Sequence, residues 1–214
     1  MKGIVVSNFR GKVKKHEIIK VIKENKLTVL LLVFLFAGMI FGAISARFAG
    51  DEILENLDFL FASNFKVRAS QSVFTTFAAS LTSSFIFVFC LFLLGLSAWG
   101  ILVIPLVPFF RGLGLGLTAG FLYSTYGLKG IAFHLIVLLP GVFLSAVAII
   151  LQSKESIGFS ARLASKIIPK GNLDRLWPSF QLYLLRTGYI FIILVFSAAI
   201  DLFFTAVFAG CFTF

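Results

Sequence analysis

The most constraining feature of the sequence is a run of 42 residues, positions 69–110, that carries no charged side chain. A helix needs about 20 apolar residues to cross a hydrocarbon core of roughly 30 Å, so the run is about twice as long as one span requires. A glycine ladder follows it, with Gly112, Gly116 and Gly120 at intervals of four residues. The run predicts an integral membrane protein that crosses the bilayer several times.

The composition of the whole chain excludes a large water-soluble domain. Of the 214 residues, 59% are hydrophobic and only 13% are charged, whereas a typical soluble domain carries about 25% charged residues. We therefore expect an all-α, polytopic membrane helical bundle. Residues 1–26 are predicted to form a basic, amphipathic cytoplasmic segment, and residues 27–214 are predicted to form a single transmembrane domain.

The uncharged stretches divide into five predicted transmembrane helices. The segment 95–110 is apolar, but it contains two glycines and two prolines, which a regular helix tolerates poorly. We interpret this segment as bent or re-entrant rather than as a further crossing. Amphipathic interfacial helices are predicted beside the spans, including in the surface loops 47–71 and 152–182. The five spans are predicted at residues 27–46, 72–94, 111–126, 131–151 and 187–210.

The distribution of charge indicates which loops face the cytoplasm. Eight of the 19 basic residues lie in the first 26 positions, and the 152–182 loop carries five basic residues against two acidic ones. Positive loops normally stay in the cytoplasm, where they face anionic lipid. With five crossings both basic segments lie inside, whereas the 47–71 loop and the carboxyl end lie outside. The same distribution favours contact with anionic lipid over binding of nucleic acid.

The 47–71 loop carries an amphipathic pattern of its own. Asp51, Glu55 and Asp58 fall on one face of a helix, opposite a set of apolar positions. Such a segment is typical of an interfacial helix whose acidic face is turned to water. The alternative is a docking surface for a partner outside the cytoplasm. Both interpretations stay open, and the three acids form the candidate partner surface.

Two of the predicted spans carry glycines at intervals suited to helix packing. Gly38 and Gly42 are four residues apart in the first span, and Gly112, Gly116 and Gly120 have the same spacing in the third. Small residues at this spacing let two helix backbones approach closely. We predict close helix packing at both places, either within one subunit or between two copies in a homo-oligomer.

Three polar residues, Arg111, His134 and Asp201, are candidates for a structural or functional role. Asp201 is the only acid within a predicted span, and an acid there is costly unless it faces a partner or a cavity. It is predicted to make a structural polar contact or to belong to a proton or ion pathway, with Arg111, Arg186 or His134 as candidate partners. Arg111 has three alternatives: reaching the cytoplasmic interface, binding a lipid headgroup, or pairing with an acid.

The sequence lacks the usual patterns of catalytic and cofactor sites. Ser97 and His134 are a nucleophile and a base of the kind that an intramembrane serine protease needs, but Ala98 replaces the final glycine of the serine motif. No metal-ligand spacing, nucleotide motif or paired carboxylate occurs. We therefore predict no catalytic residues, no cofactor, no metal and no enzymatic activity.

Several stretches resemble the stage II sporulation protein M family. Residues 36–43 are similar to that family's first span. Residues 94–100, 110–112 and 116–122 are similar to its central motif, a Gly-Leu-Ser turn followed by a basic residue, a glycine and a glycine-spaced helix. The resemblance implies a non-enzymatic scaffold in the bacterial cell membrane during sporulation and engulfment. Its implied partners are two cell-wall hydrolases, an amidase/endopeptidase and a lytic transglycosylase that degrade peptidoglycan.

A second function stays open beside this one. The stretch 139–143 resembles the family's fourth segment but lacks the histidine that relatives associated with transporters often carry. This difference points toward the sporulation branch. The broken segment 95–110 and the acid at Asp201 nevertheless motivate an alternative, a transport or channel protein or an ABC-transporter-associated membrane subunit.

Overall fold

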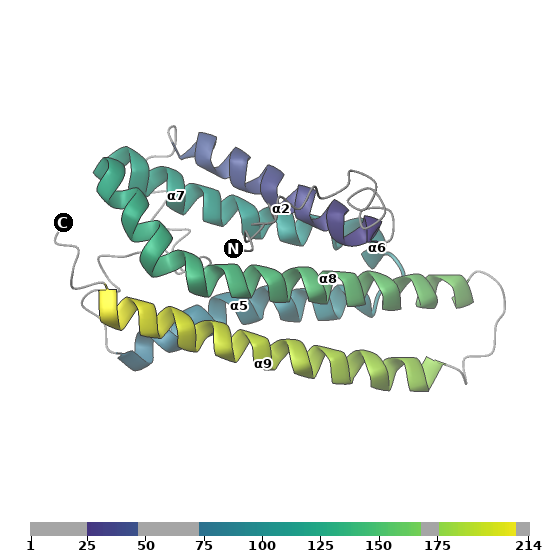
Figure 1. Ribbon diagram of the computed structural model, residues 1–214. Coiled ribbons are helices and arrows are strands. Elements are labelled where there is room, and N and C mark those ends of the chain that lie inside the picture. Colours follow the sequence, from purple (N-terminus) through teal and green to yellow (C-terminus); the bar gives the residue numbers. More distant parts are fainter. Residues whose placement is uncertain (1–24, 47–72, 168–175, 209–214) are drawn as a thin grey trace, which may run out of the picture.

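The computed structural model of the protein describes residues 25–46, 73–167 and 176–208, which are helical apart from short connections. The all-α prediction is therefore confirmed for these ranges. The candidate partner surface of Asp51, Glu55 and Asp58 lies outside them, as does nearly all of the basic segment 1–26. In chain order the elements are α2 (Lys26–Ser45), α5 (Val73–Gly95), α6 (Gly100–Val103), α7 (Leu106–Phe133), the π-helix η1 (His134–Leu138), α8 (Leu139–Ile167) and α9 (Leu176–Phe208) (Figure 1).

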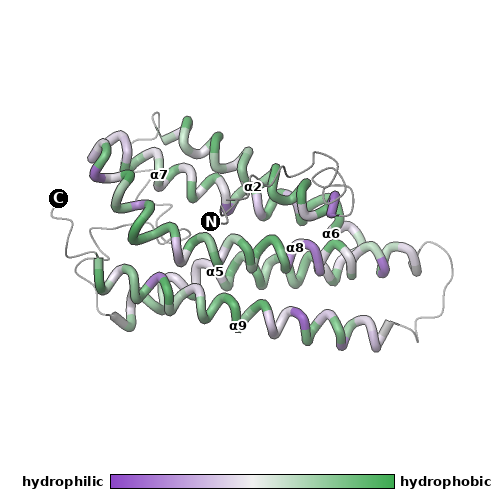
Figure 2. The backbone as a smooth tube through the Cα atoms, in the orientation of Figure 1, coloured by the Kyte–Doolittle hydropathy of each residue, from purple (hydrophilic) through white to green (hydrophobic). Residues whose placement is uncertain are grey.

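Five helical segments are long and apolar enough to cross a membrane, as the sequence predicted. Large apolar side chains such as Phe36, Phe143 and Phe196 are exposed on their outer surfaces, where lipid tails can surround them. Figure 2 shows that hydrophobic residues cover most of the length of the helices, and that hydrophilic positions are isolated between them. The candidate spans are Lys26–Ser45, Phe77–Gly95, Gly100–Ser124, Tyr126–Ser165 and Trp177–Phe208.

The predicted start of the third span near Arg111 is wrong. The segment 95–110 forms a short connection, the four-residue helix α6, a bend at Ile104 and Pro105, and the first turn of α7. Of the two interpretations of this segment, the bent one is correct. Pro108 is accommodated because it lies in the first turn of α7, where a backbone N–H has no helical partner to lose.

Most of the segment 152–182 is helical, and its first part continues α8 instead of forming a separate interfacial helix. Helix α8 continues to Ile167 and α9 begins at Leu176. At 1.5 Å per residue, their 29 and 33 residues make helices about 43 Å and 50 Å long, both longer than a hydrocarbon core of roughly 30 Å. The two helices form a hairpin that extends past the other helices beside α6 (Figure 1).

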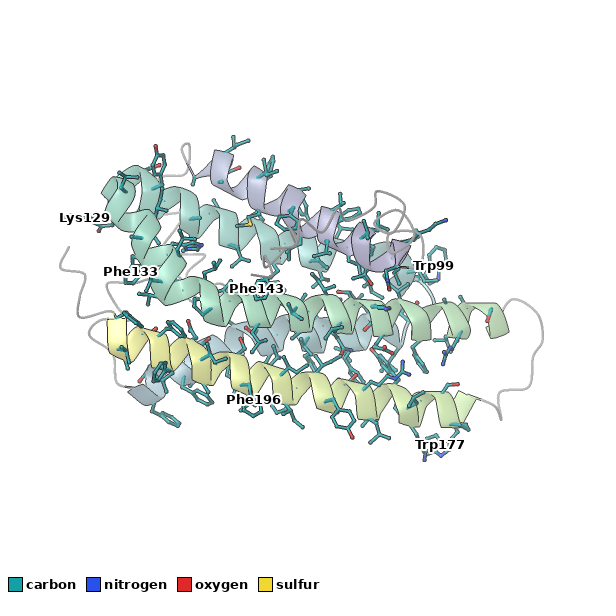
Figure 3. The ribbon with its side chains drawn as sticks, in the orientation of Figure 1. Trp99, Lys129, Phe133, Phe143, Trp177 and Phe196 are labelled. Carbon is teal, nitrogen blue, oxygen red and sulfur yellow. The ribbon has the colours of Figure 1, made fainter. Side chains whose placement is uncertain are left out.

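The chain reverses direction at Gly127, inside the stretch assigned to α7. Gly127 has a φ of 57° and a ψ of −134°, a conformation that a residue with a Cβ atom rarely adopts. The predicted spans 111–126 and 131–151 place a turn in the same stretch, and Figure 3 labels Lys129 at this end of the bundle. We call this end the Gly127 end, and we call the opposite end, where α6 and the tip of the α8–α9 hairpin lie, the α6 end.

The helices form two packing groups. Helix α2 packs almost entirely on α7, whereas α5, α8 and α9 pack on one another. Helix α8 also contacts α2 and α7 and thereby links the groups, which lie one above the other in Figure 1. The larger of two buried apolar clusters includes residues of both groups: Leu31, Leu35, Val88, Leu91, Ile104, Val107, Ile149, Ile190 and Leu194.

Candidate functional site

The five predicted packing glycines lie together in the contact between α2 and α7. A Cβ atom built on Gly38 or Gly42 would collide with a backbone carbonyl of α7, and one built on Gly112 or Gly116 would collide with a backbone carbonyl of α2. Gly120 continues the series against the end of α2. The glycines of each helix therefore form the groove that receives the backbone of the other.

The glycine contact also shows the relative direction of the two helices. Gly38 faces Phe109, and Gly42, one turn later in α2, faces Leu113, one turn later in α7. Because the two numberings increase together, α2 and α7 are parallel. The first and third spans of a chain that crosses back and forth must run in the same direction, so this packing agrees with five crossings. The contact lies within one subunit.

Arg111 lies inside the bundle, with 3% of its surface exposed. Its guanidinium donates a hydrogen bond of 2.9 Å to the hydroxyl of Ser145 on α8 and one of 3.3 Å to the hydroxyl of Ser83 on α5. Its Cζ atom also lies 5.5 Å from the centre of the Phe87 ring, within range of a cation–π contact. Arg111 therefore ties the α2–α7 pair to the other three helices rather than reaching the membrane interface.

Asp201 is buried in the contact between α9 and α8, with 1% of its surface exposed. It packs so closely on Gly141 that a Cβ atom there would lie 2.8 Å from its Cα atom. One turn earlier on α9, the Ser197 hydroxyl donates a hydrogen bond of 2.7 Å to the Gly141 carbonyl. Arg186, a predicted partner of Asp201, instead forms an ion pair with Glu155.

His134, the other predicted partner of Asp201, begins the π-helix near the Gly127 end. Its side chain is buried, and its Nδ1 atom makes no hydrogen bond within the part of the chain that the structure describes. Thr205, on α9 one turn beyond Asp201, likewise has a buried hydroxyl without such a bond. The structure thus places several buried polar groups in this half of the bundle but does not join His134 to Asp201.

A second polar cluster, which we call the Tyr183 cluster, lies nearer the α6 end. The Tyr183 hydroxyl donates to the carbonyl of Phe92 at 3.1 Å and lies 2.9 Å from the hydroxyl of Ser156. The amide nitrogen of the buried Gln152 is within 3.2–3.3 Å of Ser156, Tyr183 and Thr187. These contacts connect α5, α8 and α9 through polar groups that are buried or, at Thr187, part-buried.

The aromatic ring of Tyr183 is fixed as firmly as its hydroxyl. It stacks between the rings of Phe92 and Phe159, with centroid separations of 5.3 Å and 4.8 Å and interplanar angles of 5° and 6°. A Cβ atom at Gly95 would collide with the Tyr183 hydroxyl. The glycine that ends α5 is therefore required for α9 to bring Tyr183 against α5.

The turn between α5 and α6 is held against α8 by a separate contact. The Ser160 hydroxyl donates a hydrogen bond of 2.6 Å to the carbonyl of Ser97. Gly100, the first residue of α6, packs against the carbonyl of Leu94 and lies close to the Ser160 hydroxyl. The Gly-Leu-Ser turn therefore anchors the entry to the third span on the α8–α9 hairpin.

The geometry does not assemble a catalytic or metal site from the predicted candidates. Ser97 precedes α6 and His134 follows α7, so the 28 residues of α7 separate them. Their neighbours Trp99 and Phe133 are labelled at opposite ends of the bundle in Figure 3. Among the described residues, no three His, Cys, Asp or Glu side chains are grouped to hold a metal ion.

An apolar groove lies on the outside of the bundle between α5 and α9. It has a volume of about 330 Å³, and its lining includes Phe85, Phe89, Phe92, Gly188 and Phe191. Its surface offers almost no polar group, so it suits hydrocarbon rather than a polar ligand.

Comparison with known protein families identifies the chain. The family described as Stage II sporulation protein M matches residues 30–206. The chain belongs to this family. No curated protein and no solved structure matches it in the corresponding searches. Family membership agrees with the resemblance seen in the sequence, whose central motif corresponds to the Gly-Leu-Ser turn, Arg111 and the glycine face of α7.

The structure gives these family-like residues physical roles. The turn at Gly95 and Ser97 contacts Tyr183 and Ser160, Arg111 joins the two packing groups, and the glycine face receives α2. The chain thus uses its most family-like stretch to hold the five spans together.

Sequence reasoning missed the Tyr183 cluster, although a signal for it exists. Gly141, Ser145, Gln152, Ser156 and Ser160 follow one another at intervals of four or seven residues, which places them on one face of α8. The signal was hidden because the span ending at residue 151 and the interfacial helix expected after it were treated as separate elements. As one helix that ends at Ile167, they show a stripe of small and polar residues along one face.

Proposed function

We propose that this protein is a non-enzymatic membrane scaffold that holds peptidoglycan-degrading enzymes at the bacterial cell membrane during sporulation and engulfment. The observation that carries the proposal is the family match over residues 30–206, together with five membrane-spanning helices. The expected partners are an amidase/endopeptidase and a lytic transglycosylase.

The interior polar groups support a scaffold because they serve packing. Arg111 bonds to serines of two neighbouring helices, and the Tyr183 cluster connects three helices. In Arg111 and in the Tyr183 cluster the polar side chains bond to neighbouring helices. A hydrolase would need such side chains to face its substrate and water. A rigid body with its polar groups turned inward is suited to presenting loops to other proteins.

The partner surface in this proposal is the acidic face of Asp51, Glu55 and Asp58. The loop that carries it connects α2 to α5, and both flanking helix ends lie at the Gly127 end of the bundle. In the proposed topology this end faces away from the cytoplasm, where peptidoglycan and its hydrolases are found.

Reversal of this acidic face tests the proposal. Changing Asp51, Glu55 and Asp58 together to lysine replaces three negative charges by three positive ones, which should weaken an electrostatically complementary contact. We expect recovery of both hydrolases with the affinity-tagged protein from detergent-solubilised membranes to fall at least fivefold, corresponding to about 1 kcal/mol.

A matched control reverses charge at the other end of the molecule. Changing Lys154 to glutamate alters the charge of the α6 end and should leave hydrolase recovery unchanged. Equal recovery with the acidic-face variant and the original protein would reject the 47–71 surface. Failure to recover either hydrolase with the original protein would reject the scaffold function.

A further inference from the structure

A small polar concavity lies between α8 and α9, toward the α6 end of the bundle. Its polar rim consists of Glu155 and Arg162 from α8 and Ser179 and Arg186 from α9. It is separate from the apolar groove, which opens between α5 and α9 and shares none of these residues. Of the polar side chains that line the concavity, Tyr183 takes part in the contacts that hold the five spans together, and the four rim residues do not.

The rim carries one net positive charge, because it contains two arginines and one glutamate. Glu155 accepts a hydrogen bond of 2.6 Å from Arg186, and this ion pair holds the Arg186 guanidinium at the rim with 48% of its side chain exposed. Arg162 is exposed and forms no ion pair within the described ranges. A planar guanidinium with unused N–H groups is well suited to phosphate oxygens. The rim therefore offers two arginines and one hydroxyl to an anion.

Gly158 lines the concavity and faces open space. A Cβ atom at this position would meet no atom within 4 Å, whereas a Cβ atom at Gly38, Gly95 or Gly141 would collide with the chain itself. Glycine in a helix costs up to about 1 kcal/mol relative to alanine. Packing within the chain does not require glycine at position 158, and its missing side chain leaves room for a ligand at the concavity that Arg162 and Arg186 also line.

The depth of the concavity corresponds to the lipid headgroup layer. On α8, the exposed apolar side chains end at Leu151 and the first charged residue is Lys154. On α9, Leu182, which lines the concavity, and the nearby Leu185 are exposed, and Trp177 is exposed closer to the tip of the hairpin. Tryptophan is enriched at the membrane–water interface. The concavity therefore opens where apolar surface gives way to charge.

We propose that this concavity binds the phosphate of an anionic phospholipid from the leaflet at the α6 end. Arg162 and Arg186 contact the phosphate oxygens, Ser179 donates a further hydrogen bond, and the lipid tails lie along the exposed leucines of α9. A soluble phosphate shares the headgroup chemistry, but the flanking apolar surface favours a lipid. The inference does not depend on the hydrolase partners.

Titration of the purified full-length protein with lipid tests the proposal. Native mass spectrometry of the detergent-solubilised protein measures the affinity for dioleoyl phosphatidylglycerol and, separately, for dioleoyl phosphatidylcholine. Because one arginine near a membrane surface contributes about 1 kcal/mol, Arg162→Gln should weaken phosphatidylglycerol binding about fivefold. Gly158→Leu should weaken it at least as much by occupying the concavity, and its Cβ atom would meet no atom of the chain within 4 Å.

Two control variants separate this site from general effects. Lys129→Gln removes an exposed charge at the Gly127 end, and Gly188→Leu fills open space at another helical glycine. Both should bind phosphatidylglycerol as the original protein does, and the original protein should bind phosphatidylcholine, whose choline neutralises the phosphate charge, more weakly than phosphatidylglycerol. An unchanged affinity in Arg162→Gln and Gly158→Leu, or an equal loss in Lys129→Gln, would overturn the proposal.

An arm with inorganic phosphate distinguishes the two sources of the anion. We expect millimolar phosphate to leave phosphatidylglycerol binding unchanged, because the lipid tails contribute to the affinity for the lipid but not for the free ion. Displacement of the lipid by phosphate would overturn the assignment to a phospholipid and identify a soluble anion as the ligand.

Discussion

Arg111 shows at the scale of one residue how the chain keeps a charge inside a membrane. Placing an arginine at the centre of a membrane helix costs about 2.5–3.5 kcal/mol on insertion scales. Here the guanidinium donates to Ser145 at 2.9 Å and to Ser83 at 3.3 Å and lies over the Phe87 ring. These contacts offset the cost and fix the distance between the two packing groups. Sequence reasoning found the arginine but not its partners, because serines 28 and 34 residues away leave no local pattern.

The shorter of the two hydrogen bonds should carry more of the stability. We expect Ser145→Ala to lower the free energy of unfolding by about 1–3 kcal/mol, because it leaves a buried, charged donor without its acceptor. Ser83→Ala should cost less, since its bond is longer. Equilibrium unfolding of the purified protein in mixed micelles measures both values. Ser124→Ala, at an exposed position of α7, is the control and should change stability by less than about 0.5 kcal/mol.

At the scale of helices, the spacing of glycines correctly predicted which helix faces are in contact. The positions of glycine and proline were a poorer guide to where helices begin and end. The four-residue spacing located the faces of α2 and α7 that meet, because only small residues allow carbonyls so near. By contrast, only one of the two prolines between 95 and 110 lies at a bend, since Pro108 fits the first turn of α7. The helix expected within 152–182 continues α8 and does not stand apart from it, because charged side chains occupy exposed faces of helices that extend beyond the membrane.

Two glycines at matched sites should respond in opposite ways to one added methyl group. In Gly116→Ala the new Cβ atom would collide with the backbone carbonyl of Met39, so α2 and α7 must separate. We expect a loss of about 1–3 kcal/mol of stability, as for other overpacked interiors. In Gly188→Ala the methyl group would meet no atom within 4 Å, and stability should rise by up to about 1 kcal/mol. Unfolding in mixed micelles measures both, and equal effects would contradict the interdigitated packing.

At the scale of the whole molecule, the parallel α2–α7 pair and the long α8–α9 hairpin make the two ends of the bundle unlike. The α6 end carries Lys154, Arg162 and Arg186 against one described acid, Glu155, on the hairpin. The number of crossings was predictable from the sequence because hydrophobic length and charge placement both report on it. The greater length of α8 and α9 was not predictable, since it depends on polar contacts that hold these two helices together beyond the membrane.

This asymmetry predicts which end faces the cytoplasm. Because positively charged segments beside spans stay inside, we expect the α6 end to be cytoplasmic and Lys129, exposed at the Gly127 end, to lie outside. Single cysteines at these places, Arg162→Cys and Lys129→Cys, test this in a background where Cys90 and Cys211 are serine. A membrane-impermeant maleimide should label Lys129→Cys in intact cells but Arg162→Cys only after permeabilisation. Both variants should be labelled in permeabilised cells, which controls for access to the maleimide. Labelling of Arg162→Cys but not of Lys129→Cys in intact cells would place the 47–71 loop in the cytoplasm, away from any peptidoglycan hydrolase.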